Sequence, residues 1–172
     1  MYPYWRFNVR CNNITTINGH ELTWYDQIRY LGVYVIAARY YRCSHSNAKR
    51  SFYRAFNAMF GKIGRYASEV IIELLKMKCL PVLLYALESC PFNKTQIKSL
   101  DFAISSAFSK IFCTKSQDII DTCRTLLNCQ PLADSLCTRK RNFLCKYVKS
   151  SNVICRLFVN DANKECAKLP RQ

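Results

Sequence analysis

Basic and aromatic side chains alternate between positions 49 and 65, and these are the residues whose types and spacing best suit chemistry. Guanidinium and ammonium groups in such a row bind phosphates strongly, in a salt-dependent way that ignores base sequence. Tyr53 stands among them and suits either stacking on a base or sugar, or burial in a core. The row predicts a nucleic-acid-binding surface formed by Lys49, Arg50, Arg54, Lys62 and Arg65.

The charge balance of the whole chain favours the same kind of partner. The 172 residues include 26 Lys and Arg against 11 Asp and Glu, for a net charge of +15. The excess is spread through the sequence, which is typical of proteins that bind nucleic acids. A basic surface without a specific ligand and an anionic membrane partner are the other interpretations of this charge.

No set of residues in the sequence suits catalysis. Nucleotidyl transfer by two metal ions needs clustered carboxylates, and the 11 acidic residues never stand next to one another. Four glycines do not make a phosphate-binding loop, and no two cysteines have Cys-x-x-Cys spacing. We therefore expect no catalytic residues, no metal site and no cofactor.

The chain has 11 cysteines, an odd number, and no secretory signal precedes them. Its longest apolar run, residues 79–87, is too short to span a bilayer. Free thiols that pack as small hydrophobic side chains account best for these cysteines. We therefore expect no transmembrane segment and an intracellular, reducing location, with the nucleus and the cytoplasm both open.

The N-terminal quarter of the sequence has the pattern of β-structure. An Asn-Gly pair at 18–19 separates two runs, 14–17 and 21–24, that suit strands, and this pair is a strong hairpin signal. A third run at 28–37 is rich in Tyr, Val and Leu. These runs predict a three-stranded antiparallel meander over residues 8–37, and such a small sheet needs a covering surface.

From residue 44 the apolar period becomes helical. In the segment 46–66 the apolar side chains fall on one arc of a helical wheel, with Arg50, Arg54 and Arg65 on the other side. Further helices are expected at 68–79, from about residue 93, at 117–128 and at 132–149.

The predicted fold class is α+β, with three parts. A small N-terminal antiparallel β-meander occupies residues 1–43, and a predominantly α-helical bundle occupies residues 44–150. Residues 151–172 are polar and lack apolar periodicity, so we expect a weakly ordered tail or one marginal helix there.

An ordered series of segments carries a family resemblance: 28–33 (IRYLGV), 49–65 (KRSFYRAFNAMFGKIGR), 78–85 (KCLPVLLY) and 87–91 (LESCP), with shorter matches at 7–9, 14–16, 21–24, 67–69, 100–102 and 110–112. The segment 28–33 resembles the Tyr-Leu-Gly motif that closes the palm in LINE-type (non-LTR) retrotransposon reverse transcriptases. The segments before it resemble the final palm hairpin of the same family, and those after it resemble the family's thumb, which is helical. The resemblance covers about residues 6–145 and indicates the end of the palm followed by the thumb.

The resemblance implies roles for particular residues. In that family the Tyr-Leu-Gly turn is the primer grip, so Tyr30, Leu31 and Gly32 are primer-grip candidates, with an interior strand as an equal interpretation. The family's thumb helices hold the template–primer duplex, and the α-helical arginines described above are their counterparts by position. The family's Tyr-x-Asp-Asp box lies upstream of the matched region, so the resemblance implies origin and fold but not activity.

The leading hypothesis is a non-catalytic fragment derived from a retrotransposon RNA-directed DNA polymerase. Such a fragment is expected to bind RNA–DNA or DNA duplexes without sequence preference. A different hypothesis is an interaction or scaffold module that self-associates through an exposed palm strand. A relic reading frame without a selected role, and one part of a split or mis-annotated polymerase, are the remaining alternatives.

Overall fold

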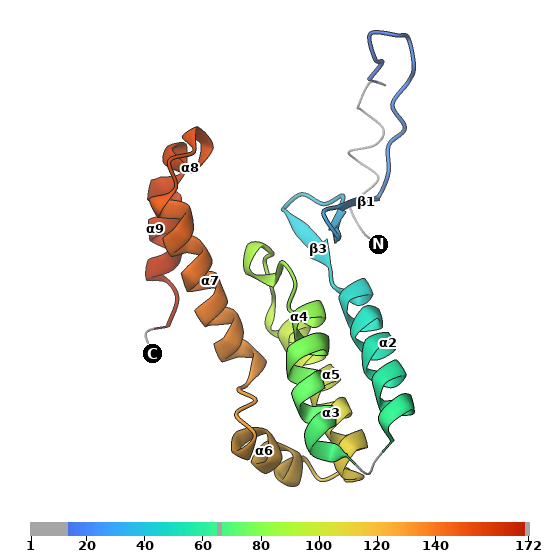
Figure 1. The fold of residues 1–172 in the computed structure, drawn as a ribbon. Helices are drawn as coiled ribbons and strands as arrows, with labels where there is room; N and C mark the ends of the chain where they lie inside the picture. Colours follow the sequence, from blue (N-terminus) through green and yellow to red (C-terminus); the bar gives the residue numbers. More distant parts are fainter. Residues whose placement is uncertain (1–13, 65–66, 171–172) are drawn as a thin grey trace. The chain divides into compact units, whose positions relative to one another are not determined.

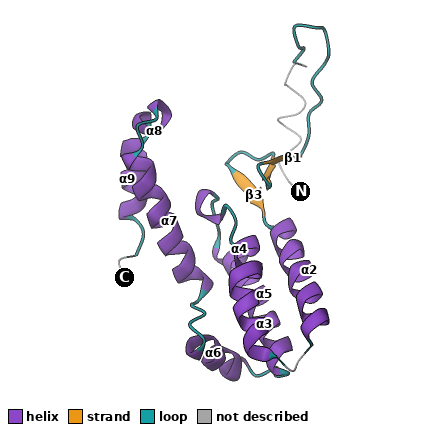
Figure 2. Cartoon of the chain, viewed as in Figure 1, coloured by secondary structure: helices purple, strands orange, loops and turns teal. Residues whose placement is uncertain are grey.

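The computed structural model describes residues 14–64 and 67–170 of the chain. The chain divides into two compact units, Met1–His45 and Ser46–Gln172. The first unit holds a small antiparallel sheet, and the second is built from helices (Figures 1 and 2). Helix makes up 63% and strand 8% of the structure, so the predicted α+β fold class is confirmed.

The sheet of the first unit has three short strands in the order β1-β2-β3. They are β1 (Gln27–Tyr30), β2 (Val33–Ile36) and β3 (Arg42–Ser44), and both neighbouring pairs are antiparallel. All four residues of β1 are exposed, and those of β2 are half-buried. Among residues 14–45, the sheet therefore has an open edge at β1 and little core of its own.

The predicted meander over 8–37 is wrong in its strand positions. The expected hairpin at 14–24 is reduced to one bridge between Thr15 and Glu21 in its described part, and residues 8–13 lie outside the described residues. The expected single strand at 28–37 is two strands, because the chain turns at Leu31 and Gly32. Their φ angles of 45° and 82° are both positive, as a two-residue type I′ turn requires.

The helices of the second unit begin with α2 (Ser46–Ile63). A continuous helical run follows, made of α3 (Ser68–Leu74), the π-helical η1 (Leu75–Cys79) and α4 (Leu80–Leu83). Pro81 lies in the first turn of α4 and has no N–H to donate, and the widened η1 turn precedes it. The short 3₁₀ helix η2 (Leu87–Ser89) then leads to α5.

Helix α5 (Lys94–Phe112) contacts α2, α3, α6 and α7 and so lies at the centre of the helical unit. It begins at a capping box, in which the Asn93 side chain accepts from the N–H of Gln96 at 2.7 Å and the Gln96 side chain accepts from the N–H of Asn93 at 3.0 Å. The predicted helix start near residue 93 is confirmed. Two further predicted helices are also confirmed, α6 (Gln117–Leu126) and α7 (Leu132–Lys149).

The core of the helical unit is made mainly by α2, the α3–α4 run and α5. Three phenylalanines of α2 are buried in it and form consecutive ring contacts, with centroids 6.3 and 5.6 Å apart. Burying each such side chain contributes about 2–3 kcal/mol to stability. The largest fully buried side chains are Phe52, Phe56, Phe108, Ile71, Leu75, Leu83, Leu100 and Leu132.

The expectation of a weakly ordered tail or one marginal helix after residue 150 needs correction. Two helices lie there, α8 (Val153–Leu157) and α9 (Val159–Ala167). Helix α9 packs against α7, with Ala162 buried and Lys140 bonded to Glu165. Tertiary contact with α7 supports a helix that the polar sequence would hardly hold alone.

Candidate nucleic-acid interface

Helix α2 separates its side chains into a buried and an exposed face. Phe52, Phe56 and Phe60 are buried, whereas Arg50 and Arg54 are exposed. The two arginines are four residues apart, so their side chains leave the helix within about 40° of one another. Neither guanidinium is part of a salt bridge within the described residues, and both are available to an external anion.

The other predicted basic residues lie in different places. Lys62 is exposed near the end of α2, about 80° around the helix from Arg54. Lys49 lies on the packing side, where its Nζ donates to Ser99 Oγ of α5 at 2.8 Å. Arg65 lies outside the described residues. The structure therefore places three predicted side chains on one exposed surface, which we call the α2 basic face: Arg50, Arg54 and Lys62.

Lys110 of α5 adds a positive charge to α2 that sequence reasoning missed. Its Nζ donates to Asn57 Oδ1 at 2.9 Å and lies 4.9 Å from the centre of the Phe60 ring. Asn57 stands about 20° around the helix from Arg50, so this ammonium group borders the α2 basic face. The contact joins residues 53 positions apart, and no local pattern marks it.

The primer-grip candidates form the turn between β1 and β2. Tyr30 pairs with Val33, and Leu31 and Gly32 are the two central residues of the turn. The side chains of Tyr30 and Leu31 are both exposed, so neither is held in a core. The interpretation of these residues as an interior strand is therefore wrong.

A polar cluster that is buried at Arg124 and half-buried at Asp101 joins three helices. Arg124 of α6 donates from Nη2 to Asp101 Oδ1 at 2.8 Å and from Nη1 to Asp101 Oδ2 at 3.0 Å. The guanidinium also donates to Ser105 Oγ and to the carbonyl of Gln130. Asp101 Oδ1 accepts in turn from the N–H of Leu132, at the start of α7. This cluster ties α6 and α7 to α5.

Asp101 and Arg124 each stabilise the ionised form of the other. Desolvation is the largest influence on Asp101 and acts to raise its pKa, but hydrogen bonds and attraction from Arg124 outweigh it, so the pKa lies below its ordinary value. The hydrogen bonds that Arg124 donates to Asp101 raise the pKa of Arg124. Both groups are therefore ionised at neutral pH. An arginine among apolar residues of α6 was the sequence signal for this cluster, and sequence reasoning did not use it.

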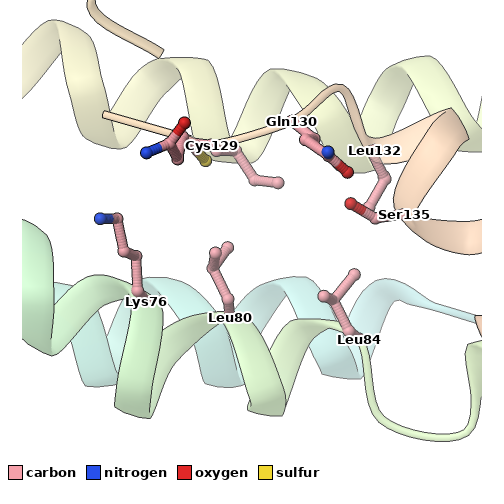
Figure 3. A pocket seen from close by; sticks show the side chains of 9 residues that line it. Lys76, Leu80, Leu84, Cys129, Gln130, Leu132 and Ser135 are labelled. Carbon is pink, nitrogen blue, oxygen red and sulfur yellow. The ribbon is translucent and has the colours of Figure 1, made fainter. Parts of the chain in front are cut away.

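A pocket of about 150 Å³ lies between the η1–α4 segment and the start of α7. Figure 3 shows Lys76, Leu80 and Leu84 on one wall and Cys129, Gln130, Leu132 and Ser135 on the other. Burial raises the pKa of the Cys129 thiol, although Arg124 and Lys76 act against this rise. The thiol is therefore protonated at neutral pH and a weak nucleophile. Lys76, which lines the same pocket, donates from Nζ to Glu73 Oε1 at 2.8 Å.

Two searches of the described residues gave negative findings. In residues 14–64 and 67–170, no group of three or more His, Cys, Asp or Glu side chains is placed to hold a metal ion. Among the helices of the same residues, none has both the length and the apolar character needed to cross a bilayer. The chain was also compared with known proteins. No family model, no curated protein and no solved structure matches it.

Proposed function

We propose that the chain binds nucleic-acid duplexes through the α2 basic face, without preference for base sequence. The observation that carries this proposal is the pair of exposed arginines, Arg50 and Arg54, on the opposite side of α2 from its buried phenylalanines. A guanidinium group without a salt bridge in the described residues can bind a phosphate directly. Its planar shape means that little conformational entropy is lost for each hydrogen bond that it donates. The net charge of +15 strengthens the attraction of the whole chain to a polyanion.

The dimensions of the α2 basic face fit a phosphate backbone. Arg50 and Lys62 are twelve positions apart in one helix, a length of about 18 Å, which equals the rise of about five base pairs along the axis of a duplex. Lys110 adds a further cation beside this row. None of these side chains is an acceptor, so the face has no means to read the donor groups of bases.

The resemblance to LINE-type reverse transcriptases supports the same proposal. The motif at Tyr30-Leu31-Gly32 is a turn here, as it is in that family, and a helix with exposed arginines follows it. We therefore propose an origin in the palm end and thumb of such an enzyme, and we assign the 172 residues a binding role without a catalytic step. Metal-dependent nucleotide incorporation by the purified chain alone would contradict this assignment.

The test is a salt titration of duplex binding, measured by fluorescence anisotropy with a DNA duplex and an RNA–DNA hybrid of unrelated sequences. Replacing Arg50 and Arg54 with Ala should lower the affinity for both. The slope of log affinity against log salt concentration should become shallower by about two units, since two phosphate contacts are lost.

The matched control is the double variant Lys146→Ala/Lys149→Ala, which removes two exposed charges one helical turn apart on α7. This control should keep the slope of the unchanged protein. Equal losses in the two double variants would mean that total charge, and not the α2 basic face, determines binding. Helical content measured by circular dichroism should be the same in all three proteins, because every replaced side chain is exposed.

A second candidate function is an interaction module that uses β1. The observation that favours it is the position of β1 at the edge of the sheet with all four residues exposed. An open edge offers unpaired backbone groups to a strand of another chain, including a second copy. Under this candidate, the chain should be a dimer in analytical ultracentrifugation and Ile28→Lys should make it a monomer. Duplex binding that survives this substitution would separate the two functions.

A further inference from the structure

The end of the α7–α8 segment exposes an unusual group of apolar side chains. Between 53% and 73% of the surface of each of four large residues is exposed, which we call the α8 tip: Val153, Ile154, Leu157 and Phe158. Helix α8 has five residues, and none of them is buried. Isolated apolar residues on a surface are ordinary, whereas four within six positions form a patch that needs a partner.

The α8 tip is held outward by local contacts. Asn152 caps the helix, since its Oδ1 accepts from the N–H of Ile154 at 2.9 Å. Cys155 is half-buried and interacts with Tyr147 of α7, so this is the side on which α8 meets the protein. Within the helical unit, α8 lies at the end of α7 that is far from α6 (Figure 1). Within the helical unit, the tip therefore lies beyond the far end of α7 (Figure 1).

The charges around the α8 tip are mostly positive, and the nearest acidic residue in the sequence is Asp161 of α9, whose carboxylate lies 3.8 Å from Lys164 Nζ. From Ser135 to Asn160 the sequence has six basic residues and no acidic one. Three of these basic side chains, Lys146, Lys149 and Arg156, are exposed near the tip, and none of the three is in a salt bridge within the described residues. A binding partner of this surface must therefore have both negative charge and an apolar region.

We propose that the α8 tip docks the protein on an anionic phospholipid bilayer. The four apolar side chains would enter the boundary between headgroups and acyl chains, and the three cations would contact lipid phosphates and carboxylates. Most protein contacts to a nucleic acid are hydrogen bonds to phosphate and sugar, which four clustered apolar side chains cannot make, so a lipid phase suits the tip better. A bilayer is soft and adapts its shape, so it can accept the four apolar side chains on the side of α8 that faces away from α7.

We expect membrane binding to need both the insertion of the apolar side chains and the attraction of the basic side chains to anionic lipids. Each basic side chain at an anionic surface raises the affinity about fivefold. Transfer of Leu157 and Phe158 from water raises it about a hundredfold together when their insertion is partial. The protein should therefore bind vesicles that contain phosphatidylserine and bind pure phosphatidylcholine vesicles at least about twentyfold more weakly.

The experiment is sedimentation of the intact chain with phosphatidylcholine vesicles, with and without phosphatidylserine. Leu157→Ser/Phe158→Ser should lower the affinity for the anionic vesicles about a hundredfold. The matched control is Leu126→Ser, which removes a side chain that is 76% exposed on α6, away from the tip. It should leave binding unchanged, and Lys146→Ala/Lys149→Ala should lower binding about twentyfold.

Three results would overturn the proposal. The first is no sedimentation of the unchanged protein with anionic vesicles, which would leave a protein groove as the partner of the tip. The second is full binding by the Leu157→Ser/Phe158→Ser variant, which would reduce the effect to adsorption by charge alone. The third is loss of vesicle binding in Arg50→Ala/Arg54→Ala, because the proposed duplex-binding surface would then be the membrane surface as well.

Discussion

Replacing Arg124 with Met should lower the free energy of unfolding of the helical unit by about 3 kcal/mol. The guanidinium is buried, with 7% of its side chain exposed, and it makes two hydrogen bonds to Asp101 and one to Ser105. Removing one member of a buried charged pair costs about 3–5 kcal/mol, because the other charge stays without compensation. The Asp101 side chain is 33% exposed and recovers some hydration, so the lower end of this range applies.

Methionine is chosen because it preserves most of the aliphatic stem and leaves little empty volume. The assay is urea unfolding followed by circular dichroism at a helical wavelength, with the slope of free energy against urea compared between variants. Arg54→Met is the control, since Arg54 is exposed and its loss should change stability by at most about 0.5 kcal/mol.

A double-mutant cycle decides whether the pair itself is responsible. Asp101→Asn and Arg124→Met, alone and combined, should give a coupling free energy of about 2 kcal/mol. A cost for Arg124→Met below about 1 kcal/mol, or a coupling near zero, would refute the reasoning that this ion pair ties α6 and α7 to α5.

The remaining predictions concern pH and the turn in the sheet. Because the folded pKa of Asp101 lies below its unfolded value, near 3.9, the ion pair contributes fully above about pH 5 and its contribution is lost as the pH falls further. The difference in urea midpoint between the unchanged protein and Asp101→Asn should therefore shrink in acid, and a constant difference down to pH 3 (about one unit below that pKa) would contradict this. Leu31→Asn should stabilise the β1–β2 hairpin by about 1 kcal/mol, since Leu31 has a φ of 45° and Asn tolerates this conformation better. Slower amide hydrogen exchange in β1 and β2 would support it, and unchanged exchange would not.

Much of the helical unit followed from local pattern. The apolar period of 46–66 predicted both the buried phenylalanines and the exposed arginines of α2, because a helix repeats every 3.6 residues wherever it packs. The start of a helix near residue 93 was also predicted, and the structure shows a capping box there between Asn93 and Gln96, whose two hydrogen bonds span only three positions.

The sheet and the C-terminal helices were predicted less well. Residues 28–37 suit a strand throughout, and only the pairing of β1 with β2 shows that the chain reverses at Leu31 and Gly32. After residue 150 the large apolar side chains cluster at 153–158 and are exposed, so they did not indicate a packed helix, and the polar helix α9 that follows depends on contact with α7. Strand pairing and helix docking depend on other segments of the chain. The apolar pattern of one short segment therefore does not predict them.

The sequence by itself determined the amphipathic helix that carries Arg50 and Arg54, along with the strong positive charge of the chain. Only the tertiary structure decided that Lys49 is bonded to Ser99, that Lys110 reaches α2, and that Arg124 is buried against Asp101. These contacts join residues 50, 53 and 23 positions apart. Side-chain type and helical period are properties of a short segment, whereas the partner of a charged group depends on which helices pack together.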